Sequence, residues 1–545
     1  MKFIFRSGKS NFLLALLIIV SIGACKKSKV EPESTAPVPV TVGPNTKQTP
    51  TTDRTQLTND SLFLYAQQVY YWNDALPSYD NFTPRTYGSD INGELFAITR
   101  FKIDPATNKP YEYRPSNPGV PKYSYIQDIT NKNPVAVLPN EQASVDLEGN
   151  GNDVGIFAVS AVGINSTTYR LYILAVDKGS PADDFGLTRG AYITKINNTT
   201  IGVTANFDSD RTVINSTIYG SPNSITIEGV KTNGATFATT LNKKSYKSNP
   251  IFKTNVLTVG AKKIGYLAYA RFSNESNSFS VLESAFADFS SQGVTDLVVD
   301  LRYNGGGYVN TAEELVNLIA PSSATGVMYK EYYNSTMQNG QATILKNQLL
   351  LDANNKVQYR NGRMLNYFDD VDYTLAKNSH SFSKKGSLNS INNIVFIVSG
   401  NTASASELVI NSLKPKMNVK LVGTQTYGKP VGFFPVLIQN KYDVYFSMFE
   451  TKNSLDQGGY YSGMVPDVVN DKDYGDYDFG NPSEGLLSAA IDVLVPKTPT
   501  VGVVSRDRVM SVSADGLGVG IKSMVGEFNQ NKEFVGMIET RLKNK

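Results

Sequence analysis

The sequence contains a single cysteine, Cys25, and a single histidine, His380. One cysteine excludes an intrachain disulfide. A zinc site made of cysteine and histidine ligands is excluded as well, because the ligands are missing, and we expect no metal. A Ser-His-Asp triad would have to use His380, which lies in the polar stretch "KNSHSFSKKG". We expect this stretch to be an exposed loop with no acid positioned beside the histidine, so the catalytic chemistry must come from other residue types.

The net charge is small: the chain has 52 Lys and Arg residues and 49 Asp and Glu residues, which gives a formal charge of +3. Three basic residues near the start, Lys2, Arg6 and Lys9, account for this excess. Without them the chain is neutral, and a neutral chain lacks the basic surface with which proteins bind nucleic acid. We therefore expect no nucleic-acid partner.

The apolar stretch 11–24 follows these basic residues. It is shorter than the roughly 20 residues that a membrane-spanning helix needs, and this arrangement is typical of a signal peptide. It ends in "IGAC", which resembles a bacterial lipobox, with cleavage before Cys25 and lipidation of its sulfur. The alternative is a simple secretory signal that happens to contain a cysteine. The sequence predicts a protein of the bacterial cell envelope, anchored by lipid and facing the periplasm or the cell surface.

Five further segments are expected after the signal peptide. Residues 25–54 are rich in Pro, Thr, Ser and Lys and predict a flexible tether. A small helical domain is expected over 55–144, and its first helix should have Asn59 or Asp60 as cap and end at Pro77. Short strands separated by Gly, Asn and Ser predict a β-rich domain over 145–247. Alternating strands and helices over 248–496 predict an α/β domain with a mixed or parallel sheet, whereas 497–545 match no pattern.

The stretch "GNTASASELVINSLKPK", residues 400–416, begins as a loop of small polar residues and becomes an apolar run. Its "SASE" fits a capping box, in which Ser404 caps a helix and Glu407 caps back, and this is the plain structural interpretation. Alternatively, Ser404 is a nucleophile, because a strand–loop–helix junction places its hydroxyl beside free backbone N–H groups. The N–H of Ala405, together with those of Gly305 and Gly306 in "NGGG", would then hold an oxyanion.

A serine nucleophile needs a base, and lysine is the residue type that remains once His380 is set aside. Lysine can act as a base where burial lowers its pKa enough to leave the amine neutral. Lys429 lies in "TYGKPVGFFPV", among aromatic and apolar residues that would desolvate it. Ser404 and Lys429 are therefore the candidate catalytic pair.

Three motifs together carry a family resemblance: "VVDLRYNGGG", "TASASE" and "TYGK". With the β-rich segment before them, they resemble the tail-specific or C-terminal processing protease family over about 145–494. The resemblance implies a crotonase-like (ClpP/crotonase) α/β peptidase core, with Ser404 as nucleophile, Lys429 as base and no cofactor. Many members have a glutamine four residues after the lysine, where this chain has Phe433. Glu407 is therefore the candidate for orienting the lysine.

The segment 177–201, "DKGSPADDFGLTRGAYITKINNTTI", resembles part of a PDZ domain, with one short helix over 181–185. Ala191 stands where such domains usually have an aspartate. The resemblance implies that a loop before the first long strand captures the C-terminal carboxylate of a peptide, which then adds as a β-strand. That loop would contain Val154, Gly155, Ile156 and Phe157. The alternative is a β-domain with a merely structural role.

Taken together, these features predict a serine-type endopeptidase that cleaves extended or unfolded polypeptides selected by their C-terminal tails. One alternative is a catalytically weak or inactive peptide-binding lipoprotein of the same fold, because Phe433 replaces the glutamine. A lipoprotein that binds glycans is disfavoured, since it would need paired carboxylates or an aromatic platform and the chain has one tryptophan.

Overall fold

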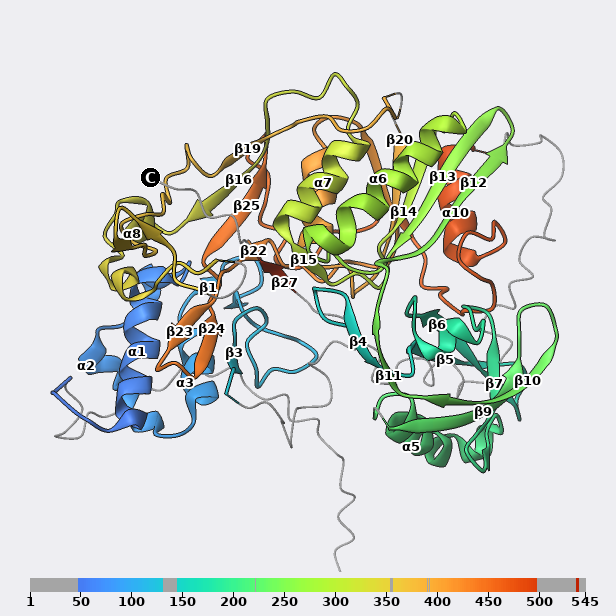
Figure 1. Ribbon diagram of the computed structural model, residues 1–545, viewed down its shortest axis with the longest axis horizontal. Coiled ribbons are helices and arrows are strands. Elements are labelled where there is room, and N and C mark those ends of the chain that lie inside the picture. Colours follow the sequence, from blue (N-terminus) through green and yellow to red (C-terminus); the bar gives the residue numbers. More distant parts are fainter. Residues whose placement is uncertain are drawn as a thin grey trace, which may run out of the picture.

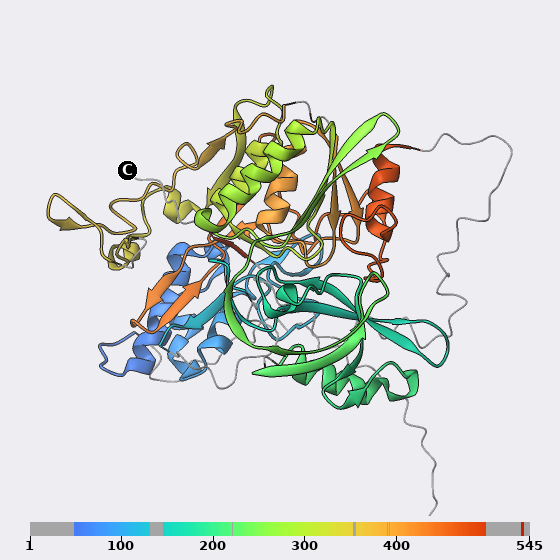
Figure 2. The ribbon, with the colours of Figure 1, turned by 45° about the vertical axis from the view of Figure 1, so that its right-hand side comes forward.

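The computed structural model describes residues 48–130, 145–220, 222–352, 356–389, 391, 393–496 and 536–538. The predicted signal peptide and Cys25 lie outside these ranges, as does most of the tether and of 497–545. Three parts are visible in Figures 1 and 2: N-terminal helices in blue, a β-rich part in teal and green, and an α/β part that contains α6 (Glu275–Ser291) and α7 (Val309–Ile319).

The α/β part is built on a six-stranded sheet of order β12-β13-β14-β20-β21-β26. β12 and β13 are antiparallel and the other neighbours are parallel. The predicted mixed sheet is confirmed, and its strand β20 is buried over most of its length. The strands are β12 (Ile251–Val259), β13 (Lys262–Tyr269), β14 (Asp296–Asp300), β20 (Asn393–Val398), β21 (Asn418–Gly423) and β26 (Val468–Val469).

Helices cover both faces of this sheet (Figure 1). Side chains alternate between the faces of a strand, so Leu297 and Val299 belong to one core and Val298 to another. The first core includes α6 (Glu275–Ser291), α7 (Val309–Ile319) and α9 (Ala405–Leu413). The second includes α10 (Gly485–Leu494).

The N-terminal helices pack onto the first of these cores. Leu62 and Phe63 of α1 (Arg54–Val69) belong to the same buried cluster as Leu408 of α9. Strand β3 (Tyr125–Asp128) also joins a three-stranded sheet with β24 (Tyr442–Tyr445) and β23 (Val436–Ile438). The described residues of the predicted helical domain therefore share a core with the α/β part.

Helix α1 begins earlier than predicted. Its N-cap is Asp53, whose carboxylate accepts from the N–H of Thr55 at 2.7 Å, and the predicted caps Asn59 and Asp60 lie inside the helix. Both are buried because each has a partner in tertiary structure: Asn59 donates to Glu94 at 2.6 Å, and Asp60 pairs with an arginine. The prediction was wrong because buried polar pairs inside a helix resemble caps in sequence.

The β-rich part has a core of its own. Its main sheet has the order β10-β9-β7-β6-β5, with β8 paired to β7, so that β5 lies at an edge. The predicted short helix is present as α4 (Pro181–Asp184). One face of this sheet belongs to the core of the β-rich part, and the other face packs on the α/β part, where the ring centroids of Phe157 and Phe252 are 5.9 Å apart. The elements are β5 (Ile156–Gly163), β6 (Tyr169–Val176), β7 (Tyr192–Ile196), β8 (Thr199–Thr200), β9 (Ser224–Val230), β10 (Thr236–Asn242) and α5 (Phe207–Thr217).

A four-stranded sheet of order β19-β16-β25-β22 lies beside α7 and α9. Its strands are β19 (Ser379–Ser381), β16 (Val327–Tyr333), β25 (Phe449–Asn453) and β22 (Val431–Gly432). The shorter elements are α2 (Tyr79–Phe82), α3 (Ile91–Ile98), β1 (Ile103–Asp104), β2 (Lys109–Pro110), β4 (Asn150–Asp153), β11 (Lys244–Lys247), β15 (Gly306–Tyr308), α8 (Ser335–Gln338), β17 (Tyr359–Arg360), β18 (Arg363–Met364) and β27 (Gly536–Ile538).

Among the helices in the described ranges, none has both the length and the apolar character needed to cross a membrane.

Candidate active site

Ser404 lies where the loop after β20 turns into α9. Its backbone has φ 61° and ψ −111°, a strained conformation for a residue with a side chain. Such strain persists where the surrounding structure imposes it, and it is characteristic of a nucleophile on a sharp strand-to-helix turn. Ser404 is fully buried, and its Oγ makes no hydrogen bond to any residue that the structure describes. No hydrogen bond in this part of the chain therefore holds the hydroxyl in place.

The capping box predicted from the sequence is present at the start of α9. Glu407 Oε2 accepts from the Ser404 N–H at 2.9 Å, so the glutamate caps back as the pattern predicts. The Glu407 N–H lies toward the Ser404 side chain, as the other half of the box requires, but Ser404 Oγ makes no hydrogen bond within accepted distance and angle limits. The residue pattern thus forms a helix start in which the serine hydroxyl makes no hydrogen bond to the described residues.

The glycine loop 304–307 runs directly beside Ser404. Asn304 O accepts from the Ala403 N–H at 3.2 Å and from Ser406 Oγ at 3.0 Å, which ties the two loops together. A side chain at Gly306, where φ is 111°, would bring its Cβ to 3.0 Å from Ser404 Cβ. Only glycine allows so close an approach.

The predicted oxyanion donors differ in their availability. Ala405 is the first residue of α9, a position whose N–H has no partner within the helix. The Gly306 N–H, in contrast, already donates to Asn304 Oδ1 at 2.9 Å. In this arrangement Ala405 and Gly305 are the better candidates, and their role remains a prediction.

Lys429 is buried among groups that oppose a positive charge. Burial lowers the pKa of its amine from 10.5 to about 7, although the negative charges of Glu112 and Glu407 act in the opposite direction. Lys429 Nζ lies 4.4 Å from the ring centre of Phe433 and 3.5 Å from Tyr123 O. A large fraction of this lysine is therefore neutral near pH 7, as a general base must be.

Glu407 joins the backbone of the serine to the backbone of the lysine. Its Oε2 accepts from the Ser404 N–H at 2.9 Å and from the Lys429 N–H at 2.7 Å. Its Oε1 accepts from the Gly428 N–H at 2.8 Å and from Thr426 Oγ1 at 2.5 Å. Burial raises the pKa of this carboxyl, and the four hydrogen bonds oppose that rise. One buried side chain thus fixes the separation of the two candidate catalytic residues.

The N-terminal part supplies three site residues that the sequence did not reveal. Tyr123 places its backbone carbonyl against Lys429 Nζ, and its hydroxyl donates to Gly428 O at 2.6 Å. Glu112 is fully buried and accepts from the N–H of Ser124 at 2.9 Å. Lys122 carries a second, half-buried amine, and desolvation lowers its pKa to about 8. No local pattern marks these residues, because their partners are about 300 positions away in the sequence.

His380 is not the exposed residue that the sequence predicted. It is buried in β19, stacks on the ring of Tyr329 at 4.3 Å, and its Nδ1 lies 2.5 Å from Glu313 Oε1. The prediction failed because the polar residues around it alternate across a strand, which a sequence pattern does not distinguish from a loop. Strands β16 and β25 lie between β19 and β22, which follows Lys429, so the histidine belongs to a different place in the fold.

The predicted carboxylate-binding loop leads into the edge strand β5. Val154, Ile156 and Phe157 are buried, and the Gly155 N–H donates to Asp153 Oδ1 at 2.7 Å. On β5 itself, the Val159 N–H donates to the hydroxyl of Tyr219 at 3.1 Å. Two of the backbone donors that a captured peptide would need are therefore already bonded within the chain.

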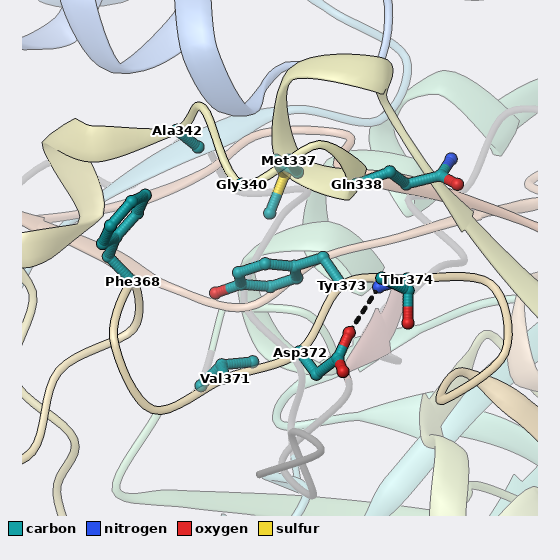
Figure 3. A pocket seen from close by; sticks show the side chains of 9 residues that line it. All are labelled: Met337, Gln338, Gly340, Ala342, Phe368, Val371, Asp372, Tyr373 and Thr374. Atoms are coloured by element: carbon teal, nitrogen blue, oxygen red, sulfur yellow. Dashed lines mark hydrogen bonds between the residues drawn. The ribbon is translucent and has the colours of Figure 1, made fainter. Parts of the chain in front are cut away.

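The part of the chain that the structure describes contains no group of three or more His, Cys, Asp or Glu side chains placed to hold a metal ion. A small pocket of about 150 Å³ lies between α8 and the segment 368–374, with the ring of Tyr373 across it (Figure 3). Asp372 at its edge accepts from the Thr374 N–H at 2.8 Å. Neither Ser404 nor Lys429 lines this pocket, so it is separate from the candidate active site.

The chain is similar to known peptidases. Residues 263–469 match peptidase family S41. The chain is 24% identical over 278 residues to a chloroplastic C-terminal processing peptidase of Tetradesmus obliquus, a match that spans 47% of this chain and about half (47%) of that relative. It is 22% identical over 365 residues to a carboxyl-terminal-processing protease of Synechocystis, covering 65% of this chain and 70% of the relative.

A solved structure from Bacteroides fragilis, described as an S41 protease, is 20% identical and has a TM-score of 0.49, covering 82% of this chain and 99% of its own. The sequence match over 263–469 includes Ser404, Lys429 and the glycine loop. Residues 263–469 therefore match an S41 serine-peptidase domain, and the chain is similar at low identity to C-terminal processing proteases.

Proposed function

We propose that this protein is an endopeptidase that hydrolyses peptide bonds with Ser404 as nucleophile and Lys429 as general base. The observation that carries the proposal is the clamp formed by Glu407, which holds the backbone of a strained, uncommitted serine and that of a buried lysine on one carboxylate oxygen. A nucleophile and a base fixed relative to each other are the minimum that acyl transfer requires.

The reaction needs no group from outside the chain apart from water. Ser404 Oγ attacks the peptide carbonyl while neutral Lys429 takes its proton, and the tetrahedral oxyanion receives hydrogen bonds from the backbone N–H groups of Ala405 and Gly305. Lys429 then gives the proton to the leaving amine. The resulting acyl-enzyme is hydrolysed by a water molecule that the neutral lysine activates in the same way.

Extended polypeptides are the proposed substrates, with the β-rich part acting as a PDZ-like module that captures their tails. The edge position of β5 supports this role, because an exposed strand edge accepts an added peptide strand. The Val159 N–H of β5 donates to the Tyr219 hydroxyl, so this hydrogen bond must break before a peptide can pair with that part of the strand.

We further propose that the mature protein begins at Cys25 and is held at the bacterial envelope by lipid on that residue. The support is the lipobox-like sequence and the tether that follows it. If Cys25→Ser protein fractionates with the membrane as wild type does, the anchor lies elsewhere.

The main alternative is a peptide-binding protein of the same fold that has lost activity. Phe433 favours it, because the ring next to Lys429 Nζ offers no hydrogen-bond acceptor of the kind that a glutamine would. Cleavage of unfolded casein by wild type and by Ser404→Ala separates the two. Cleavage that disappears in the variant supports the peptidase, and equal residual cleavage in both proteins supports the alternative.

A further inference from the structure

A short strand of this chain lies inside the candidate active site. β27 (Gly536–Ile538) lies between β15 (Gly306–Tyr308) of the glycine loop and the segment that follows Lys429, as the dark red strand in Figure 1 shows. It pairs in parallel with β15, and the Gly536 N–H donates to Gly305 O at 3.1 Å. On the opposite edge, the Phe433 N–H donates to Met537 O at 3.2 Å.

The carbonyl of Gly536 faces the same small space as the nucleophile. A Cβ built on Gly306 would overlap Gly536 O and would also lie 3.0 Å from Ser404 Cβ. A single methyl group would therefore touch both the strand's carbonyl oxygen and the serine side chain. The next residue, Met537, is fully buried within the large core of the α/β part.

These contacts are the ones that a peptide substrate would need. A peptide that adds as a strand gains affinity from main-chain hydrogen bonds along both edges, and specificity from pockets for its side chains. Gly305 O and the Phe433 N–H flank the candidate dyad, and β27 already uses both. A substrate that takes the same path must first displace this strand.

We propose that residues 536–538 occupy the substrate position of the protein's own active site and act as an inhibitor in cis. This inference rests on the proposed peptidase function and adds its regulation. It also defines the substrate class as an extended segment that binds parallel to β15. Such a segment presents a small residue at the carbonyl facing Ser404, followed by an unbranched apolar residue in the place of Met537.

The test uses the full chain with Met537→Asp, which places a charge in the buried pocket and should release the strand. Met524→Asp, the same change within the segment 497–535, is the matched control. Hydrogen–deuterium exchange measures the amides of 305–308 and 431–434, and casein cleavage is measured in each protein with and without Ser404→Ala. We expect faster exchange at both sites in Met537→Asp alone, with Ser404-dependent cleavage increased about tenfold.

A peptide of sequence EFVGMIET, residues 533–540, should restore protection and slow cleavage when added to Met537→Asp, whereas the same peptide with Asp in place of Met should not. Exchange that is unchanged by Met537→Asp would overturn the proposal. Faster exchange with Ser404-dependent cleavage no faster than wild type would overturn the inhibitory role.

Faster exchange in a protein without any Ser404-dependent cleavage would support occupancy of the site and count against the peptidase function instead. If Met537→Asp fails to fold by circular dichroism, Gly536→Pro replaces it, because proline lacks the N–H that donates to Gly305 O and leaves the buried Met537 side chain unchanged. The same readouts and the same outcomes then apply.

Discussion

Lys429→Met replaces the buried amine by an apolar side chain of similar length and separates its catalytic role from its effect on stability. If Lys429 is the base, the variant should lose cleavage by about a hundredfold or more, the usual contribution of a general base. The same variant should be more stable than wild type near neutral pH, because a lysine in this position is held in an unfavourable environment.

The size of the stability gain follows from the pKa. Burial lowers the pKa of Lys429 from 10.5 to about 7, so between these values the unfolded chain binds more protons than the folded one. The cost of burying the lysine is therefore complete below pH 7 and is relieved as the pH rises toward 10.5. A difference of this size corresponds to roughly 4 kcal/mol at pH 7, which methionine would recover in part or in full.

Urea unfolding of wild type and Lys429→Met at pH 7 and pH 9.5 measures this gain, which should shrink at the higher pH. For wild type, kcat/KM on an unfolded substrate should rise with pH around a midpoint near 7, because only the neutral amine accepts a proton. Lys384→Met is the control, since desolvation lowers the pKa of Lys384 to about 8 at a place where its amine bonds Leu318 O. It should keep wild-type cleavage.

Two results would refute this reasoning. A folded Lys429→Met protein that cleaves at the wild-type rate would remove Lys429 from the mechanism. An unfolding free energy lower than that of wild type at both pH values would show that the lysine is not held at a cost, and the pH dependence of cleavage would then need another source.

Three further predictions concern Glu407 within the site and two buried charged or titratable residues away from it. Glu407→Gln places an N–H₂ group against backbone N–H donors, so we expect the free energy of unfolding in urea to fall by about 1–3 kcal/mol. The midpoint of the kcat/KM pH profile should also fall, because the carboxylate that raises the Lys429 pKa is gone. An unmoved midpoint would limit Glu407 to a structural role. His380→Phe keeps a ring against Tyr329 but loses the contact with Glu313, so the melting temperature should fall while Ser404-dependent cleavage stays at wild-type level. A large loss of cleavage would contradict the separation of β19 from the site. Arg189→Met removes one cation from the buried ion network that joins the β-rich part to Glu484. Unfolding experiments should show about 3 kcal/mol less stability. No change in stability would mean that Arg302 compensates fully.

The sequence was most informative where chemistry depends on the local backbone. The strand–loop–helix around Ser404, the glycine loop and the alternation of strands and helices in the α/β part follow from hydrophobic patterns and small residues that are close together in the chain. The candidate pair could be named for the same reason, since one histidine and one cysteine leave few bases for a serine. Glu407 was found as a helix cap, and its bond to the Lys429 N–H needed the structure.

By itself, the sequence determined the resemblance to a peptidase family, the α/β alternation and the residue types available for catalysis. Tertiary structure alone decided that Tyr123 and Glu112 complete the environment of Lys429, that His380 is buried in a sheet, and that Gly536 lies beside Ser404. The physical reason is that periodicity and capping report on neighbours in the chain. The burial that lowers the Lys429 pKa comes instead from segments hundreds of residues apart, brought together by a shared core.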